Sequence, residues 1–286
     1  MNKNTLIAFI DGSAHMPILC EYAAQFAFWS DASIKLYHVI ENQAGADKND
    51  LSGAINLGAR TKLMDELVSE GAKKSKAALL QGRNLIESAK KRLSDLGCSN
   101  VELRLRTGDI AQTLKNKESE GDLVLIGKRG ENTSIEKQRI GDNFERIVRT
   151  SSKPIFVSNS TFRDINHVLV AFDGSLPSIR ILEYLLGGPI FRKLKISVLG
   201  VSKLKEDPFG PEQKSLVMNL NKNQNLISFI NASGDPKDQI MKHIHEQKSD
   251  MLAIGAYGHS KLRNLFIGST TSTLIHSSPV PVLLSK

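Results

Sequence analysis

The sequence is poor in cysteine and in long apolar runs. It contains only two cysteines, Cys20 and Cys98, far apart and outside any Cys-x-x-Cys pattern. This scarcity argues against a structural disulfide or a zinc site and is typical of proteins from a reducing compartment. Only five apolar residues in a row precede Asp11, and no run approaches the roughly 18 apolar residues of a membrane helix. We therefore expect a cytoplasmic protein that does not cross a membrane.

Several catalytic signatures are also missing. The sequence has no GxxxxGK[ST], no GxGxxG after a first strand, no GxSxG and no HExxH. These absences argue against a P-loop enzyme, a dinucleotide-dependent enzyme, an α/β-hydrolase and a zinc protease. We assign no catalytic residue and no metal ligand, and the sequence favours a binding module over a dedicated catalyst.

The chain is basic, with a formal net charge of +8, and an anionic partner would suit that charge. However, many of its lysines cluster in two helix-like stretches, "GAKKSKAALL" and "SAKKRLSD". The simplest interpretation is a solvated helix face. Nucleic-acid binding is disfavoured because no aromatic residues alternate with the basic ones and no known motif is present.

What the sequence does contain is an internal repeat. Four segments recur in the same order: Leu6–Ser13 as Val168–Ser175, Arg106–Leu114 as Ala232–Ile240, Asp122–Gly130 as Asp250–Gly258, and Ser151–Asn159 as Ser277–Ser285. Conserved order along the chain indicates two copies of one domain. We predict domain 1 over residues 1–160 and domain 2 over residues 161–286.

Each copy alternates short apolar runs with longer amphipathic ones, in the order βαβαβαβαβ. The sequence therefore predicts an α/β protein of two tandem doubly wound domains, each a five-stranded parallel sheet with helices on both faces. Residues 41–100 add a long helical insert to domain 1, with a stripe of Leu79, Ile86, Ala89 and Leu93. We expect the domains to form a pseudo-dimer through the last strands, "KPIFVS" and "PVPVLL". A further homodimer stays open.

Glycines follow the fourth strand of domain 2 in a distinctive pattern. Gly255, Gly258 and Gly268 are separated by two and then nine residues, and Ser269 follows at once. Ligands of such sheets bind at the carboxyl ends of the strands, where a helix N-terminus attracts anions. Asp173, at the end of the first strand, would lie at the same edge. On spacing alone, phosphate binding and simple turn formation both remain open.

The pattern Gly-x2-Gly-x9-Gly-Ser resembles the ATP-binding signature of the universal stress protein family. "VLVAFDGS" resembles the opening strand of that family, and "SGDP" resembles the start of its third helix. The likeness covers nearly the whole chain as a tandem pair. It implies a Rossmann-like fold of the adenine nucleotide alpha hydrolase type and an ATP-binding protein with a regulatory or stress-response role.

The resemblance also implies roles for individual residues. Asp173 would face the nucleoside, and Val201 would meet the adenine through its backbone. The phosphates would be held by Gly255, Gly258, Gly268, Ser269 and Thr270. Whether Mg2+ accompanies ATP, and whether ATP is slowly hydrolysed, both remain open.

Domain 1 departs from this signature. Ten residues separate Gly130 from Gly141, and Asp142 replaces the serine. A carboxylate at a helix start accepts from the N–H groups that a phosphate would use, and it repels the phosphate. The cations at 128 and 129 offset this only in part, so we predict one nucleotide site per chain.

An alternative function is open at this point. Because domain 1 lacks the complete signature and the insert could line an apolar groove, the chain could instead bind a hydrophobic or acidic small ligand that is not a nucleotide, with no functional ATP site.

Overall fold

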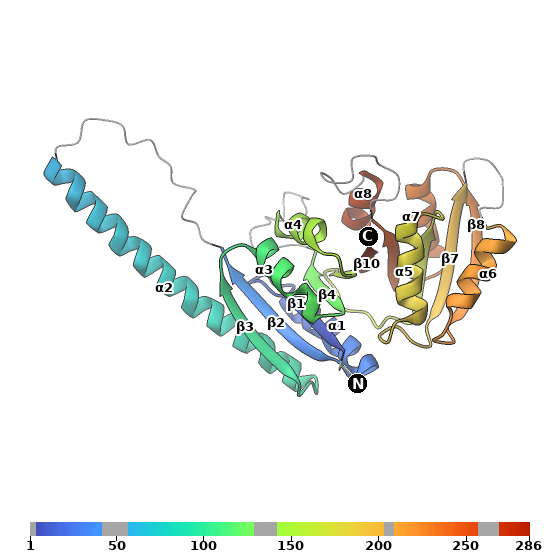
Figure 1. Ribbon diagram of the computed structural model, residues 1–286, viewed down its shortest axis with the longest axis horizontal. Coiled ribbons are helices and arrows are strands. Elements are labelled where there is room, and N and C mark those ends of the chain that lie inside the picture. Colours follow the sequence, from blue (N-terminus) through green and yellow to red (C-terminus); the bar gives the residue numbers. More distant parts are fainter. Residues whose placement is uncertain (1–3, 42–56, 129–141, 203–208, 257–268) are drawn as a thin grey trace.

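A single sheet of ten strands runs through the protein (Figure 1). The computed structural model describes residues 4–41, 57–128, 142–202, 209–256 and 269–286, without the side chains of 57–68, 70, 142, 269 and 270. The strand order is β3-β2-β1-β4-β5-β10-β9-β6-β7-β8. Domain 1 supplies β1 (Thr5–Phe9), β2 (Ser33–Ile40), β3 (Val101–Thr107), β4 (Leu123–Gly127) and β5 (Ile155–Ser158). Domain 2 supplies β6 (His167–Phe172), β7 (Lys195–Ser202), β8 (Leu226–Ser233), β9 (Met251–Gly255) and β10 (Val282–Ser285).

Helices cover both faces of the sheet, which explains the continuous apolar strands. One face packs against α1 (Met16–Ser30), α2 (Leu57–Asp95), α5 (Leu176–Gly187) and α6 (Pro211–Leu220). The other face packs against α3 (Ile110–Lys117), α4 (Asp142–Thr150), α7 (Pro236–Glu246) and α8 (Ser269–Ser277). The predicted α/β class with tandem, doubly wound domains is confirmed.

The two domains meet where β5 pairs antiparallel with β10, a junction that we call the seam. Phe156 lies opposite Leu283 in this pair, and both side chains are fully buried. Tyr22 and Phe26 of α1 pack on Phe156, with ring centroids 4.9 and 4.8 Å apart. All other neighbouring strands in the sheet are parallel. The expected pairing of the last strands is confirmed, and it joins two five-stranded halves into one sheet.

The helix of the insert, α2, packs against its own domain. Ile86, Ala89 and Leu93 are buried as predicted, whereas Leu79 is 39% exposed. The helix ends in a left-handed Gly97, with φ +89°, and the Cys98 N–H donates to Leu93 O. Figure 1 shows α2 at the end of the molecule away from domain 2. The described part of the insert therefore extends domain 1 and does not cover domain 2.

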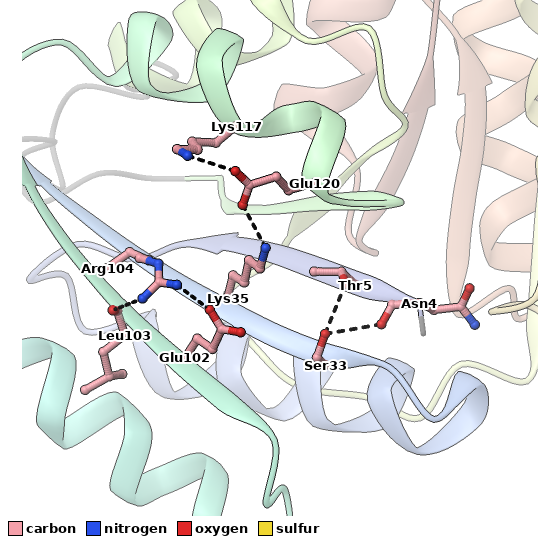
Figure 2. A network of polar contacts seen from close by, with 9 residues as sticks. All are labelled: Asn4, Thr5, Ser33, Lys35, Glu102, Leu103, Arg104, Lys117 and Glu120. Atoms are coloured by element: carbon pink, nitrogen blue, oxygen red, sulfur yellow. Dashed lines mark hydrogen bonds and ion pairs between the residues drawn. The ribbon is translucent and has the colours of Figure 1, made fainter. Parts of the chain in front are cut away.

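Ion pairs form on β2 and β3, the two strands at the outer side of domain 1 (Figure 2). Lys35 of β2 donates to Glu120 at 2.7 Å, and Lys117 donates to the same carboxylate at 2.8 Å. These hydrogen bonds lower the pKa of Glu120 from 4.5 to about 2. Glu102 and Arg104 pair on β3, so this edge strand carries charge, which discourages pairing with other chains.

Among the helices of the described residues, none is both long and apolar enough to cross a membrane.

Candidate nucleotide site

The strand order of domain 2 reverses between β6 and β9, which are parallel neighbours. The helix after β6, α5, packs on one face of the sheet, and the helix before β10, α8, packs on the other. The two connections therefore diverge at the carboxyl ends of β6 and β9. Open α/β sheets bind their ligands at such a point of divergence.

Asp173 follows β6 directly and lies exposed at this edge. Its Oδ1 accepts a hydrogen bond from the Ser175 N–H at 3.0 Å, across Gly174, whose φ of +74° requires glycine. Ser175 then caps α5, and its Oγ accepts from the Ser178 N–H. The sequence Asp-Gly-Ser thus forms a compact turn from strand to helix, and Asp173 has a structural role in addition to the role implied by the resemblance.

Gly255 ends β9 beside this turn. A Cβ at Gly255 would lie 2.6 Å from the Ser178 backbone nitrogen and 2.7 Å from the Pro177 carbonyl carbon. The first turn of α5 therefore rests directly on Gly255, and no side chain fits between them. The sequence offered phosphate binding or turn formation for this glycine. The structure adds a third role, the close packing of a helix.

Two further elements reach the same edge. Val201 lies near the end of β7, half-buried, and packs with the apolar cluster on the α7 and α8 face. Asp235 caps α7, and its Oδ1 accepts from the N–H groups of Lys237 at 2.9 Å and Asp238 at 3.2 Å. Gly234 precedes it with φ +129°. Because β7 and β8 are parallel to β6, their carboxyl ends lie at the edge that holds Asp173.

Ser269 and Thr270 are the first two residues of α8. Since β9 and β10 are parallel, the helix between them runs back along the sheet, and its N-terminus faces the carboxyl edge. The backbone N–H groups of this first turn are suited to an anion. Gly258 and Gly268 lie outside the described residues. The structure thus places Asp173, Val201, Gly255 and the start of α8 at one edge of the sheet.

The comparisons with known proteins agree with this architecture. The model of the universal stress protein family matches residues 1–159 and again residues 164–286. The chain belongs to the universal stress protein family. It is 30% identical over 290 residues to universal stress protein Slr1230 of Synechocystis, and the match covers 98% of this chain and 99% of that protein. A crystal structure of a universal stress protein from Archaeoglobus fulgidus matches the whole chain with a TM-score of 0.65 and 20% identity, and the match covers 99% of that chain.

Domain 1 of this universal stress protein has the same strand-to-helix turn at the carboxyl edge of its sheet, but its α4 is held there by ion pairs. Asp11 repeats the strand-to-helix turn, and its Oδ1 accepts from the Ser13 N–H at 3.0 Å. On α4, however, Arg146 pairs with Glu41 at 2.7 Å and also with Asp109, the residue that caps α3. Arg146 therefore ties α4 to the end of β2 and to the start of α3.

Arg146 was not predicted from the sequence. It is the fifth residue of α4, and the fifth residue of α8 is Thr273, so domain 2 has no cation at that position. The contrast between these matching positions is the only sequence signal that could have drawn attention to it. Arg146 and its two partners, Glu41 and Asp109, come from distant segments, and only the fold brings them together.

Lys128 of this universal stress protein follows Gly127 at the end of β4. Its ammonium donates across the seam to the Ser278 carbonyl of domain 2, at 3.1 Å. Lys128 thus contributes to the contact between the domains, where a cavity of about 110 Å³ also lies. Arg129 and Asp142 cannot be compared in the same way, since residue 129 and the side chain at 142 lie outside the described ones.

Neither cysteine offers a reactive thiol at the site. Cys20 is buried in the core, and burial raises the pKa of its thiol to about 12. Within the described ranges, no cluster of three or more His, Cys, Asp or Glu residues is arranged to hold a metal ion.

Proposed function

We propose that this universal stress protein is a cytoplasmic ATP-binding protein with a regulatory or stress-response role, and that domain 2 holds the nucleotide. The observation that carries the proposal is the complete Gly-x2-Gly-x9-Gly-Ser spacing between the end of β9 at Gly255 and the start of α8 at Ser269. The two ends of this spacing, Gly255 and the start of α8, lie at the carboxyl edge of the sheet beside the reversal of strand order, where a helix N-terminus favours phosphate.

Different residues would contact the phosphates and the nucleoside. Gly255, Gly258 and Gly268 let the backbone approach phosphate oxygens, because they carry no Cβ. Ser269 and Thr270 add hydroxyl donors at the start of α8. Asp173 and the backbone of Val201 would contact the nucleoside.

Domain 1 would not bind ATP. Its glycine spacing is one residue longer, and Asp142 stands where domain 2 has Ser269. The ion pairs of Arg146 with Glu41 and Asp109 support the same conclusion. They hold α4 against the elements that would border the nucleoside.

Calorimetric titration of the full chain with ATP, with and without Mg2+, tests the proposal. We expect one site per chain. Two sites would show that Asp142 does not exclude phosphate, and no binding would refute the ATP proposal and favour a ligand that is not a nucleotide.

A matched pair of substitutions locates the site. Ser269→Asp gives domain 2 the residue of domain 1, and we expect ATP affinity to fall about 100-fold or more, because charge repulsion replaces a hydrogen bond of a few kcal/mol. An aspartate favours a helix start, so the fold should persist. The control, Asp142→Ser in domain 1, should leave affinity and stoichiometry unchanged. Loss of binding in the control but not in Ser269→Asp would assign the site to domain 1.

A further inference from the structure

A cavity at the seam lies between the residues that follow β5 and those that precede β10. Its volume is about 110 Å³, several times what one water molecule needs but well below the roughly 300 Å³ of the smallest pockets for drug-sized ligands. The described residues that line it come from both domains and from the link between them: His15, Lys128, Asn159, Ser160, Thr161, Ser278 and Pro279. Only Pro279 among them is apolar and none is acidic, so the cavity is suited to a small anion rather than to a nucleotide.

Lys128 supplies a positive charge to the wall of this cavity. Its ammonium donates to the Ser278 carbonyl across the seam at 3.1 Å, and this bond fixes the position of the charge. An ammonium carries three N–H donors, so a carbonyl and an anion can share it. The start of α1 also borders the cavity, because His15 is the N-cap residue of that helix. The positive end of the helix dipole therefore adds to the potential that favours an anion.

The side chains of His15, Ser160 and Thr161 can donate hydrogen bonds to a ligand in this cavity. His15 makes no capping hydrogen bond to α1, and its imidazole has no other partner within the described residues. The hydroxyls of Ser160 and Thr161 likewise have no protein partner in the part of the chain that the structure describes. Both residues are exposed, so a solute can reach the cavity from their side.

Hydrogen bonds on the inner side of the cavity hold the link between the domains in place. The Tyr22 hydroxyl is shared between Asn159 Oδ1, at 3.1 Å, and the Thr161 carbonyl, at 3.3 Å. Asn159 Nδ2 donates in turn to the Pro279 carbonyl at 3.2 Å. These bonds order the backbone that carries Ser160 and Thr161 before any ligand arrives, and such preorganisation lowers the cost of binding.

The matching place on the other side of the seam is closed. The repeat pairs three lining residues with residues of the other copy: Lys128 with Ala256, Asn159 with Ser285, and Pro279 with Lys153. These three counterparts also lie together at the seam, but the space between them has a volume of about 0 Å³. Lys286 lies beside them and donates to the Arg149 carbonyl. The open cavity is therefore a feature of one side of the seam and not a consequence of the fold alone.

Two extra residues of domain 1 bring His15 to the cavity. After the Asp-Gly-Ser turn, domain 1 continues with Ala-His-Met-Pro and domain 2 with Leu-Pro. Helix α5 begins directly after Ser175, whereas the chain of domain 1 passes through Ala14 and His15 before α1 begins. Both basic residues of the cavity, His15 and Lys128, are thus absent from the corresponding positions of domain 2.

We propose that this cavity binds a small inorganic oxyanion with the charge and size of phosphate, between the two domains. Lys128 balances part of the charge, and His15, Ser160 and Thr161 donate hydrogen bonds to the oxygens. A tetrahedral anion has oxygens on all sides, so it can accept at once from the start of α1, the end of β4 and the link. The site is separate from the edge at β6 and β9, and it does not depend on ATP binding in domain 2.

An NMR titration of the full chain with inorganic phosphate, at constant ionic strength, tests the proposal. We expect the amide signals of Ser160 and Thr161 to shift with a dissociation constant of about 1 mM or below. Lys128→Met removes the charge and should raise this constant at least about tenfold. Lys153→Met is the matched control, because it removes a cation from the closed counterpart, and it should leave the constant unchanged.

A second variant keeps the contact between the domains intact. Thr161→Val removes one hydroxyl but leaves the bond from Lys128 to Ser278, and it should raise the dissociation constant about fivefold. Unchanged signals of Ser160 and Thr161 up to about 20 mM phosphate would refute the site. Equal effects of Lys128→Met and Lys153→Met, or no effect of Thr161→Val, would refute it as well.

Ser269→Asp separates this site from the proposed ATP site. Phosphate should bind to this variant as it does to wild type, and Lys128→Met should still bind ATP. Loss of the phosphate-induced shifts in Ser269→Asp would place the anion at α8 and overturn the seam site. A chain that binds phosphate at the seam but does not bind ATP would refute the proposed function alone.

Discussion

At the scale of single residues, Gly255 combines two demands that its place in a glycine motif does not reveal. The motif suggests an approach to phosphate, whereas the structure places the Ser178 nitrogen 2.6 Å from the position of a Cβ. The contact is with backbone, so it can be relieved only by shifting α5. We predict that Gly255→Ala destabilises the protein by about 1–3 kcal/mol, as overpacking does, in urea unfolding.

Gly187→Ala is the matched control for this prediction. A Cβ at Gly187 would meet the Leu220 carbonyl oxygen at 4.0 Å, an ordinary contact, so stability should hardly change. If Gly255→Ala unfolds like wild type, α5 does not rest on this glycine as described. In that case, a loss of ATP binding in Gly255→Ala would indicate a lost phosphate contact. If α5 is displaced instead, a loss of binding does not distinguish a lost phosphate contact from the shift of the helix.

A second residue-scale prediction concerns Glu120, whose pKa is lowered to about 2 by hydrogen bonds from Lys117 and Lys35. A lowered folded-state pKa gives stability that is present above the unfolded value of 4.5 and is lost as the pH falls toward 2. Since the carboxylate is 35% exposed, we expect Glu120→Gln to cost at most about 1 kcal/mol at pH 7. Urea unfolding at pH 7 and at about pH 2 checks this, and the difference from wild type should be clearly smaller at the lower pH, where about half of the carboxylate is protonated in the folded state.

The exposed pair of Lys242 and Glu246 supplies the control for Glu120. Its atoms are 3.7 Å apart and its side chains are 57% and 51% exposed. Glu246→Gln should therefore change stability by less than Glu120→Gln at pH 7. A pH-independent cost of Glu120→Gln would mean that packing, not charge, is what the substitution removes.

At the scale of elements, Gly71 limits the stability of the exposed part of α2. An added Cβ there would meet nothing within 4 Å, and alanine is the better helix former, so Gly71→Ala should stabilise this part of the helix by about 1 kcal/mol. We therefore predict a stronger helix signal at 222 nm for Gly71→Ala than for the wild type. An unchanged or weaker signal would show that alanine is not favoured at this position of the helix.

The elements themselves were largely predictable. The four repeated segments and the apolar runs of about five residues were enough to predict a parallel sheet covered on both faces. Leu79 was placed in the core stripe of α2 because periodicity does not say where the sheet ends. The ion pairs of Arg146 and the packing of α5 on Gly255 join residues that are far apart in the sequence. A local sequence pattern therefore cannot predict these contacts.

The candidate site divides in the same way. Strand ends and helix starts follow from the sequence, so the positions of Asp173, Val201, Gly255 and Ser269 around one edge could be anticipated. The turn role of Asp173 could not, because it requires the Ser175 N–H to point back at the carboxylate. Both Asp-Gly-Ser segments form this turn, so its repetition reflects chain geometry at least as much as ligand binding.

At the scale of the whole molecule, the seam makes one sheet of two domains. Both core clusters include residues from each domain, and Phe26 of α1 packs on Phe191 of domain 2, with ring centroids 5.3 Å apart. Polar contacts across the junction reinforce this packing: the Tyr184 hydroxyl donates to the Asp122 carbonyl at 3.2 Å, and Lys286 donates to the Arg149 carbonyl. We therefore expect the two domains to unfold together.

Ligand linkage tests this cooperativity through the proposed site. ATP at about 100 times its dissociation constant should stabilise the folded chain by about 2.7 kcal/mol. If the sheet unfolds as one unit, hydrogen exchange should slow by the same factor in β1 of domain 1 and in β6 of domain 2, although only domain 2 holds ATP. Ser269→Asp should abolish both effects together. Protection confined to β6 would show that the seam does not couple the domains, and the one sheet would then consist of two units that open independently.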